Sequence, residues 1–232
     1  EGHGSVNLSK AITESCNVYF YHLIQKIGLD LWARYARLFG FGEKTGIDLP
    51  EEVAGIIPDR AFMDRRYGRG GWSRGNLLNI VIGQGDVLVT PVQMARFIAL
   101  VATRGKPITP WLAFVEETPR DKGEPLTVEL KASTWDKIHE MTFNVVNLPS
   151  GTGYGARVSD PRIEVHGKTG TAENPHGEPH AWFVGFATRD DESIALSVLV
   201  ENGGMGGTSA APLAGKIVKQ YFGPPEDMFT AQ

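Results

Sequence analysis

The chain has 232 residues, of which 41% are apolar and 22% charged, which is typical of a globular protein and excludes a disordered chain or a coiled coil. Its formal net charge of −4 at pH 7 offers no electrostatic basis for binding nucleic acid. Cys16 is the only cysteine, so no disulfide can form within the chain. The apolar runs are too short to span a bilayer.

Capping residues and helical spacing of apolar side chains predict several helices in the first 150 residues. Residues 41–90 have Gly, Pro and Arg at positions that interrupt every pattern, so we expect a long irregular segment there. The predicted helices are a short one capped by Asn7 or Ser9, one over 18–27 stopped by Gly28, one from Asp30 to Gly40, one from Pro91 to Gly105, and one from Ser133 to about Val146.

The pattern changes to that of strands after residue 161. Residues 162–166 alternate and lead into Gly167-Lys168-Thr169-Gly170, while 182–187 and 194–200 read as two further strands. Pro212 opens a last helix that runs to Tyr221. Helices followed by neighbouring strands and a closing helix indicate an α+β protein with a mostly antiparallel sheet.

Two short motifs could carry chemistry. In Lys168-Thr169-Gly170-Thr171, lysine supplies a positive charge, threonine a hydroxyl that can bind a carboxylate, and glycine space for a ligand against the strand. Ser15-Cys16-Asn17 forms a polar break between two predicted helices. Taken alone, a strand-end turn explains the first motif and a helix cap explains the second.

Taken together, the motifs resemble the K-T-G and S-x-N parts of the set S-x-x-K, S-x-N and K-T-G found in penicillin-recognising serine acyltransferases. Further segments resemble class B penicillin-binding proteins, above all the elongation-type subgroup, penicillin-binding protein 2. These segments are Gly46–Pro50, Gly83–Gly85 with Thr90–Ala95, Gly151–Gly153, His180–Phe186 and Glu201–Gly204.

The resemblance implies the penicillin-recognising serine transpeptidase and β-lactamase-like fold. In that fold an antiparallel five-stranded sheet is flanked by helices and lies beside an all-helical lobe. We expect residues 1–150 to build mainly the helical lobe and residues 151–232 mainly the sheet lobe.

The resemblance also implies a peptidoglycan D,D-transpeptidase. Ser15 and Lys168 would be catalytic and relay a proton, and Thr169 would bind the substrate carboxylate. A core position is the simpler interpretation of Trp182. The remaining substrate-binding residues that the resemblance implies are Asn17 for the substrate amide, Gly170, Thr171 through its backbone N–H, and Trp182 as a cleft wall.

One part of the set is missing, because no serine in the chain is followed by lysine three residues later. In the family this S-x-x-K segment precedes S-x-N, so we expect the nucleophile upstream of this chain. Its absence leaves open a non-catalytic module that binds stem peptides or β-lactams, for instance as a sensor. A serine β-lactamase is a second alternative, although no typical group that activates a deacylating water is recognised.

The proposed chemistry requires no cofactor. His3 and Cys16 flank the first predicted helix, and thiolate with imidazole suits Zn²⁺. Two further ligands would have to come from outside this chain. The alternative is that Cys16 simply packs beneath the motif.

The resemblance finally implies partners and a location. The partners are peptidoglycan stem peptides, β-lactam antibiotics, and a membrane-embedded glycan polymerase within the cell-elongation complex. The location is the periplasmic or extracytoplasmic face of the inner membrane, with an anchoring N-terminal helix outside this chain.

Overall fold

A computed structural model describes residues 2–106, 108–112 and 126–223. The chain forms two compact units, each treated by itself below. The first contains Glu1–Ala11 and Cys16–Lys131, and the second contains Ile12–Ser15 and Ala132–Gln232. The short helix α1 (Leu8–Thr13) runs through the point at which the two units meet in the sequence.

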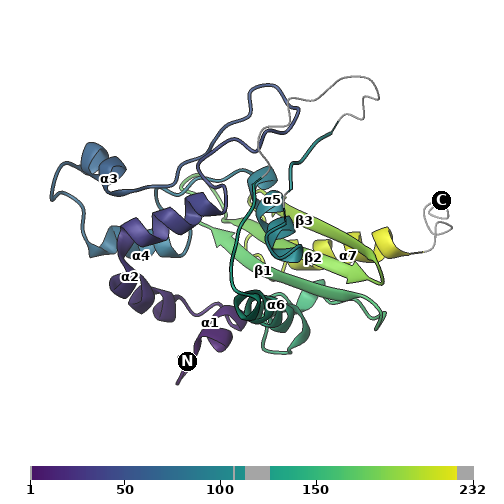
Figure 1. The fold of residues 1–232 in the computed structure, drawn as a ribbon. Coiled ribbons are helices and arrows are strands. Elements are labelled where there is room, and N and C mark those ends of the chain that lie inside the picture. Colours follow the sequence, from purple (N-terminus) through teal and green to yellow (C-terminus); the bar gives the residue numbers. More distant parts are fainter. Residues whose placement is uncertain (1, 107, 113–125, 224–232) are drawn as a thin grey trace. The chain divides into compact units, whose positions relative to one another are not determined.

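The first unit is built from helices joined by long loops (Figure 1). Helix α2 changes direction at Gly28, whose φ of 75° lies in the left-handed region. Leu29, Met63 and Ile80 form the buried centre of a cluster that joins three of the helices. The helices are α2 (Asn17–Leu38), α3 (Arg60–Tyr67), α4 (Arg74–Val81) and α5 (Pro91–Ala102).

The expectation of an irregular segment over 41–90 was wrong at α3 and α4. Asp59 caps α3 by accepting a hydrogen bond of 2.8 Å from the Phe62 N–H. Ser73 and Asn76 form a reciprocal capping box at the start of α4. Both helices have only eight residues, so local caps, rather than a long apolar repeat, mark them in the sequence.

The second unit contains a three-stranded antiparallel sheet in the order β1-β2-β3. Helix α6 packs along β1, and α7 packs against β2 and β3 (Figure 1). The α+β class and the antiparallel sheet are therefore confirmed. The elements are α6 (Ala132–Asn147), the 3₁₀ turn η1 (Tyr154–Ala156), β1 (Glu164–Ala172), β2 (His180–Arg189), β3 (Glu192–Val200) and α7 (Ala210–Phe222).

One face of this sheet carries the apolar core of the second unit. Side chains alternate across a strand, so one set of positions from each strand meets small residues of α7. Phe183 is fully buried at the centre. The other buried members are Val146, Ala156, Val165, Ala181, Ala187, Leu196, Val198, Ala210, Ala211, Ala214, Val218 and Phe222. The opposite face, which includes Lys168, packs against α6 and buries His166 and Phe186.

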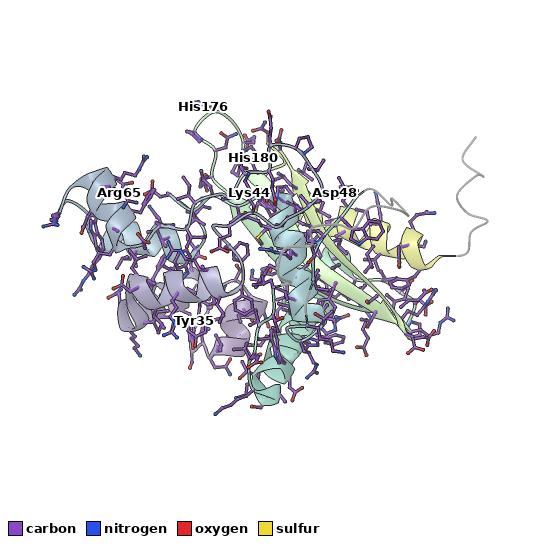
Figure 2. The ribbon with its side chains drawn as sticks, turned by 45° about the horizontal axis from the view of Figure 1, so that its top comes forward. Tyr35, Lys44, Asp48, Arg65, His176 and His180 are labelled. Carbon is purple, nitrogen blue, oxygen red and sulfur yellow. The ribbon has the colours of Figure 1, made fainter. Side chains whose placement is uncertain are left out.

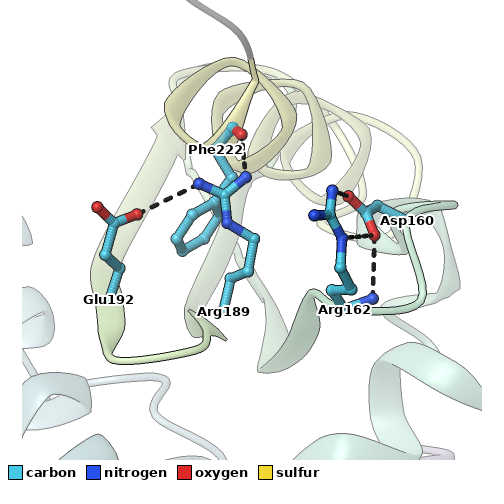
Figure 3. A network of polar contacts seen from close by, with 5 residues as sticks. All are labelled: Asp160, Arg162, Arg189, Glu192 and Phe222. Carbon is cyan, nitrogen blue, oxygen red and sulfur yellow. Dashed lines mark hydrogen bonds and ion pairs between the residues drawn. The ribbon is translucent and has the colours of Figure 1, made fainter.

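The C-terminal end of α7 is fastened to the sheet by Arg189 at the end of β2 (Figure 3). Its guanidinium donates to the carbonyl oxygen of Phe222, lies 5.0 Å from the centre of that ring, and pairs with Glu192 at 3.3 Å. A cation at this position also complements the helix dipole. Nearby, Arg162 makes a two-pronged contact with Asp160, and this holds the pKa of that carboxyl at about 2.

The expected number of strands needs correction, since the sheet has three strands within the described residues instead of five. Only the three segments after residue 161 have a strand pattern, which alternates over 162–166 and is largely apolar over 182–187 and 194–200. Two isolated bridges, Ile56 with Leu88 and Ile108 with Leu126, are the only other strand-like pairings there. None of the helices in the described ranges is long and apolar enough to cross a membrane.

Candidate active site

The Lys-Thr-Gly motif lies inside β1 and not beyond its end. Lys168 pairs with Val184 of β2, and Gly170 pairs with Trp182. The regular antiparallel register therefore fixes the backbone of the motif residue by residue. Lys168 and Thr169 consequently point to opposite faces of the strand.

Ser15 sits in a strained turn at the end of α1. Its φ of 53° is left-handed, and the Cys16 N–H donates to the Ala11 carbonyl over 2.9 Å. This is the Schellman arrangement, in which glycine is the usual residue at the left-handed position. A serine there costs roughly 1 kcal/mol of conformational energy. The hydroxyl is therefore present although the local backbone conformation favours glycine.

That hydroxyl is a partner of Lys168. The Lys168 Nζ donates to the Ser15 Oγ over 2.9 Å and to the Thr169 carbonyl oxygen over 3.0 Å. Both acceptors are neutral, so they offset only part of the cost of burying an ammonium group. Burial consequently lowers the pKa of Lys168 to about 8.

Thr169 turns its hydroxyl toward the loop that follows α6. Its Oγ1 donates to the Oγ1 of Thr152 over 2.7 Å, and the Thr152 N–H donates to the Thr13 carbonyl over 3.1 Å. Thr171 accepts a hydrogen bond of 3.2 Å from the Gly206 N–H. The Thr152 contact was missed in the sequence, where the only sign of it was a threonine between two glycines.

Two other predicted site residues have clear positions. Trp182 is half-buried and does not belong to the apolar core, and it packs closely against Gly170, where a Cβ would lie 3.2 Å from the Trp182 Cβ. Asn17 is exposed at the start of α2, in the first unit. The second unit therefore brings Ser15, Lys168 and Thr169 together by itself.

The connection between β1 and β2 is held at the same end of the sheet as the motif. Asn202 accepts from the Asn174 side-chain amide over 2.7 Å, and its N–H donates to His180 Nδ1 over 3.0 Å. Figure 2 shows His176 on this connection and His180 where β2 begins. These contacts hold the connection in place next to the motif.

His166, two residues before Lys168, was also missed as a structural residue. It is buried, stacks on Phe186 at 4.4 Å between ring centres, and its Nδ1 lies 3.0 Å from the His139 carbonyl oxygen. Burial lowers its pKa, so it is neutral at pH 7. It anchors β1 against α6 beside the motif.

His3 and Cys16 do not form a metal site by themselves. Cys16 is buried where α2 begins, and the His3 carbonyl accepts from Lys10 Nζ over 2.8 Å. No group of three or more possible ligands occurs among the residues that the structure describes. Two ligands are half of what tetrahedral zinc requires, so a zinc site at this pair stays a prediction that depends on ligands from outside this chain.

Burial of the Lys168 ammonium group should lower the stability of the folded chain, and this effect can be measured. Replacing Lys168 with Met should raise the free energy of unfolding at pH 7 by about 1–3 kcal/mol, because the folded state no longer has to bury an ammonium group. Between pH 8 and 10.5 the unfolded wild type holds a proton that the folded form has lost, so wild-type stability rises and the difference shrinks.

Urea unfolding across this pH range measures the effect, with the exposed Lys137 changed to Met as a matched control. A Lys168→Met chain that is less stable at pH 7, or a difference that does not change with pH, contradicts this account.

Comparison with known proteins identifies the family. The family described as the penicillin-binding protein transpeptidase domain matches residues 1–219. The peptidoglycan D,D-transpeptidase MrdA of Haemophilus influenzae is 36% identical over 95% of this chain and 37% of its own length. The chain thus spans little more than a third of that curated relative.

Two solved structures are similar. Pseudomonas aeruginosa PBP2 in complex with WCK 5153 has a TM-score of 0.85 and 32% identity, covering 95% of this chain and 48% of that one. PBP2 of Helicobacter pylori in complex with MreC has a TM-score of 0.79 and 33% identity, covering 94% and 40%. This chain belongs to the penicillin-binding protein transpeptidase domain family.

Proposed function

We propose that this chain supplies part of the active site of a peptidoglycan D,D-transpeptidase, which cross-links stem peptides through a serine acyl-enzyme. The observation that carries the proposal is the 2.9 Å contact between Lys168 Nζ and Ser15 Oγ, which joins two motifs 153 residues apart. The name of the Haemophilus influenzae relative agrees with this activity.

The nucleophilic serine belongs, in this proposal, to an S-x-x-K segment outside these 232 residues, because the chain contains no such tetrad. Its oxygen attacks the penultimate D-alanine carbonyl, the C–N bond breaks, and the terminal D-alanine leaves with a proton on its amine. An amine of a neighbouring stem peptide then attacks the ester, loses a proton, and the serine oxygen regains one.

Ser15 and Lys168 relay protons in both steps. A hydroxyl can accept one proton while giving up another, and an amine with a pKa of about 8 exchanges protons readily near neutral pH. Thr169 binds the terminal carboxylate, and the backbone N–H of Thr171 is the candidate donor to the oxyanion. Asn17 holds the substrate amide. Side-chain and backbone groups supply this chemistry without a cofactor.

A non-catalytic binding module is the second candidate function, and the missing S-x-x-K favours it. Such a module would use Thr169 and Lys168 to hold a stem-peptide or β-lactam carboxylate without forming a covalent bond. The two functions differ in whether a penicillin becomes attached.

The partners that we propose are those that membership of this family implies. The Helicobacter pylori complex of PBP2 with MreC supports a partner of that kind. We extend the proposal to a membrane-embedded glycan polymerase of the cell-elongation complex, at the extracytoplasmic face of the inner membrane. An anchoring helix would lie outside this chain.

Intact-mass spectrometry with benzylpenicillin tests the assignment of the nucleophile. The 232-residue chain alone should gain no mass, because acylation requires an activated serine. The longer protein with the S-x-x-K segment should gain one penicillin on the serine of that segment. An adduct on Ser15 or any other serine of this chain contradicts the assignment, and no adduct on the longer protein favours the non-catalytic module.

Replacing Thr169 with Val tests the carboxylate site in the longer protein. Loss of a charge-assisted hydrogen bond costs roughly 1.5–3 kcal/mol, so acylation by benzylpenicillin should slow by about 10- to 150-fold. Thr169→Ser keeps the hydroxyl and serves as the matched control. If the wild type reacts equally well with benzylpenicillin and its methyl ester, Thr169 does not bind the carboxylate.

A further inference from the structure

Hydrogen bonds and short stretches of chain join Thr13, Ser15, Thr152, Lys168 and Thr169 into a closed circuit. The Thr152 N–H donates to the Thr13 carbonyl, two residues before Ser15, and the Thr152 Oγ1 lies 2.7 Å from the Oγ1 of Thr169. Lys168 closes the circuit by donating to both the Thr169 carbonyl and the Ser15 hydroxyl. Thr152 therefore contacts both halves of the candidate site.

The position of Thr152 is fixed by its neighbours. The Gly153 N–H donates to the Val145 carbonyl over 3.0 Å, and a Cβ on Gly207 would lie 2.7 Å from the Thr152 carbonyl oxygen. Backbone on one side and a glycine on the other leave the loop little freedom. The fixed backbone holds the Thr152 hydroxyl next to Thr169, because this β-branched side chain is short and has few allowed rotamers.

Hydroxyl chemistry defines what Thr152 can do. Each threonine has one O–H to donate, and a carboxylate only accepts. In the structure Thr169 donates to Thr152. When Thr169 turns its proton to a ligand carboxylate, its oxygen needs a donor, and the Thr152 hydroxyl is in place to become that donor. Hydrogen bonds in such a chain strengthen one another.

We propose that Thr152 is a positioning residue that orients the Thr169 hydroxyl toward the substrate or β-lactam carboxylate. This inference rests on the proposed function, because it assumes that Thr169 binds that carboxylate. It predicts that Thr152 affects only ligands with a free carboxylate, and only when Thr169 is present.

The test uses the longer protein and the second-order rate constant of acylation. Thr152→Val, which keeps the shape and removes the hydroxyl, should slow the reaction with benzylpenicillin by about tenfold, whereas the methyl ester should react at the wild-type rate. Thr152→Ser should stay within about threefold of wild type. Thr188→Val, at the other end of β2, is the matched control and should have no effect.

A double variant separates orientation from general damage. In the Thr169→Val background, Thr152→Val should cause no further loss with benzylpenicillin, because its only route to the ligand is already gone. Thermal unfolding shows whether Thr152→Val folds. If it does not, Thr152→Ser is compared with the wild type instead. Its ratio of acylation rates with benzylpenicillin and with the methyl ester should match the wild-type ratio.

Three results overturn the inference: an unchanged rate in Thr152→Val, equal losses with the acid and the ester, or additive losses in the double variant. These results require a wild type that reacts with benzylpenicillin. A longer protein that does not react contradicts the proposed function itself, so the two failures are distinguishable.

Discussion

The burial of Lys168 against two neutral oxygens is the constraint on which the site depends. Burying an ammonium group destabilises the folded chain unless an anion joins it, and among the described residues the Lys168 Nζ donates to a hydroxyl and a carbonyl, both neutral. Ser15 adds a second local cost, because it occupies a left-handed position that suits glycine. One hydrogen bond thus joins a buried ammonium group and a serine in a left-handed conformation, each unfavourable for stability. Such local violations of stability are characteristic of a functional site.

The rest of the second unit holds this pair in place. One face of the sheet is packed against α7, and β1 is fixed along α6, where the Asn147 amide donates to the Val165 carbonyl over 2.9 Å and His166 stacks on Phe186. The strand can therefore present Lys168 and Thr169 on opposite faces without bending. Rigid strands position side chains more accurately than loops do, and the proton relay proposed for Lys168 would require such accuracy.

Much of the fold could be predicted from the sequence, because its signals are local. Thr90 followed by Pro91 marks the start of α5, alternation marks β1, and short apolar runs mark β2 and β3. The helices α3 and α4 were missed because each has only eight residues, too few for an apolar stripe to repeat, and only the caps Asp59 and Ser73 mark them. The contact between Ser15 and Lys168 spans 153 residues, so no local pattern predicts it and only the family resemblance did. The role of Thr152 depends on three segments that meet in space, and a threonine between two glycines does not predict it.

The most direct test of this account is the pKa of Lys168 itself, measured by NMR on the chain with ¹³C-labelled lysine. The Lys168 signal is the one that disappears in Lys168→Met. The account predicts that its Cε resonance titrates with a midpoint at about 8, because burial disfavours the charged form. A midpoint near the ordinary lysine value of 10.5 would show that the ammonium group is solvated, and would contradict the buried Lys168–Ser15 pair as the basis of the site.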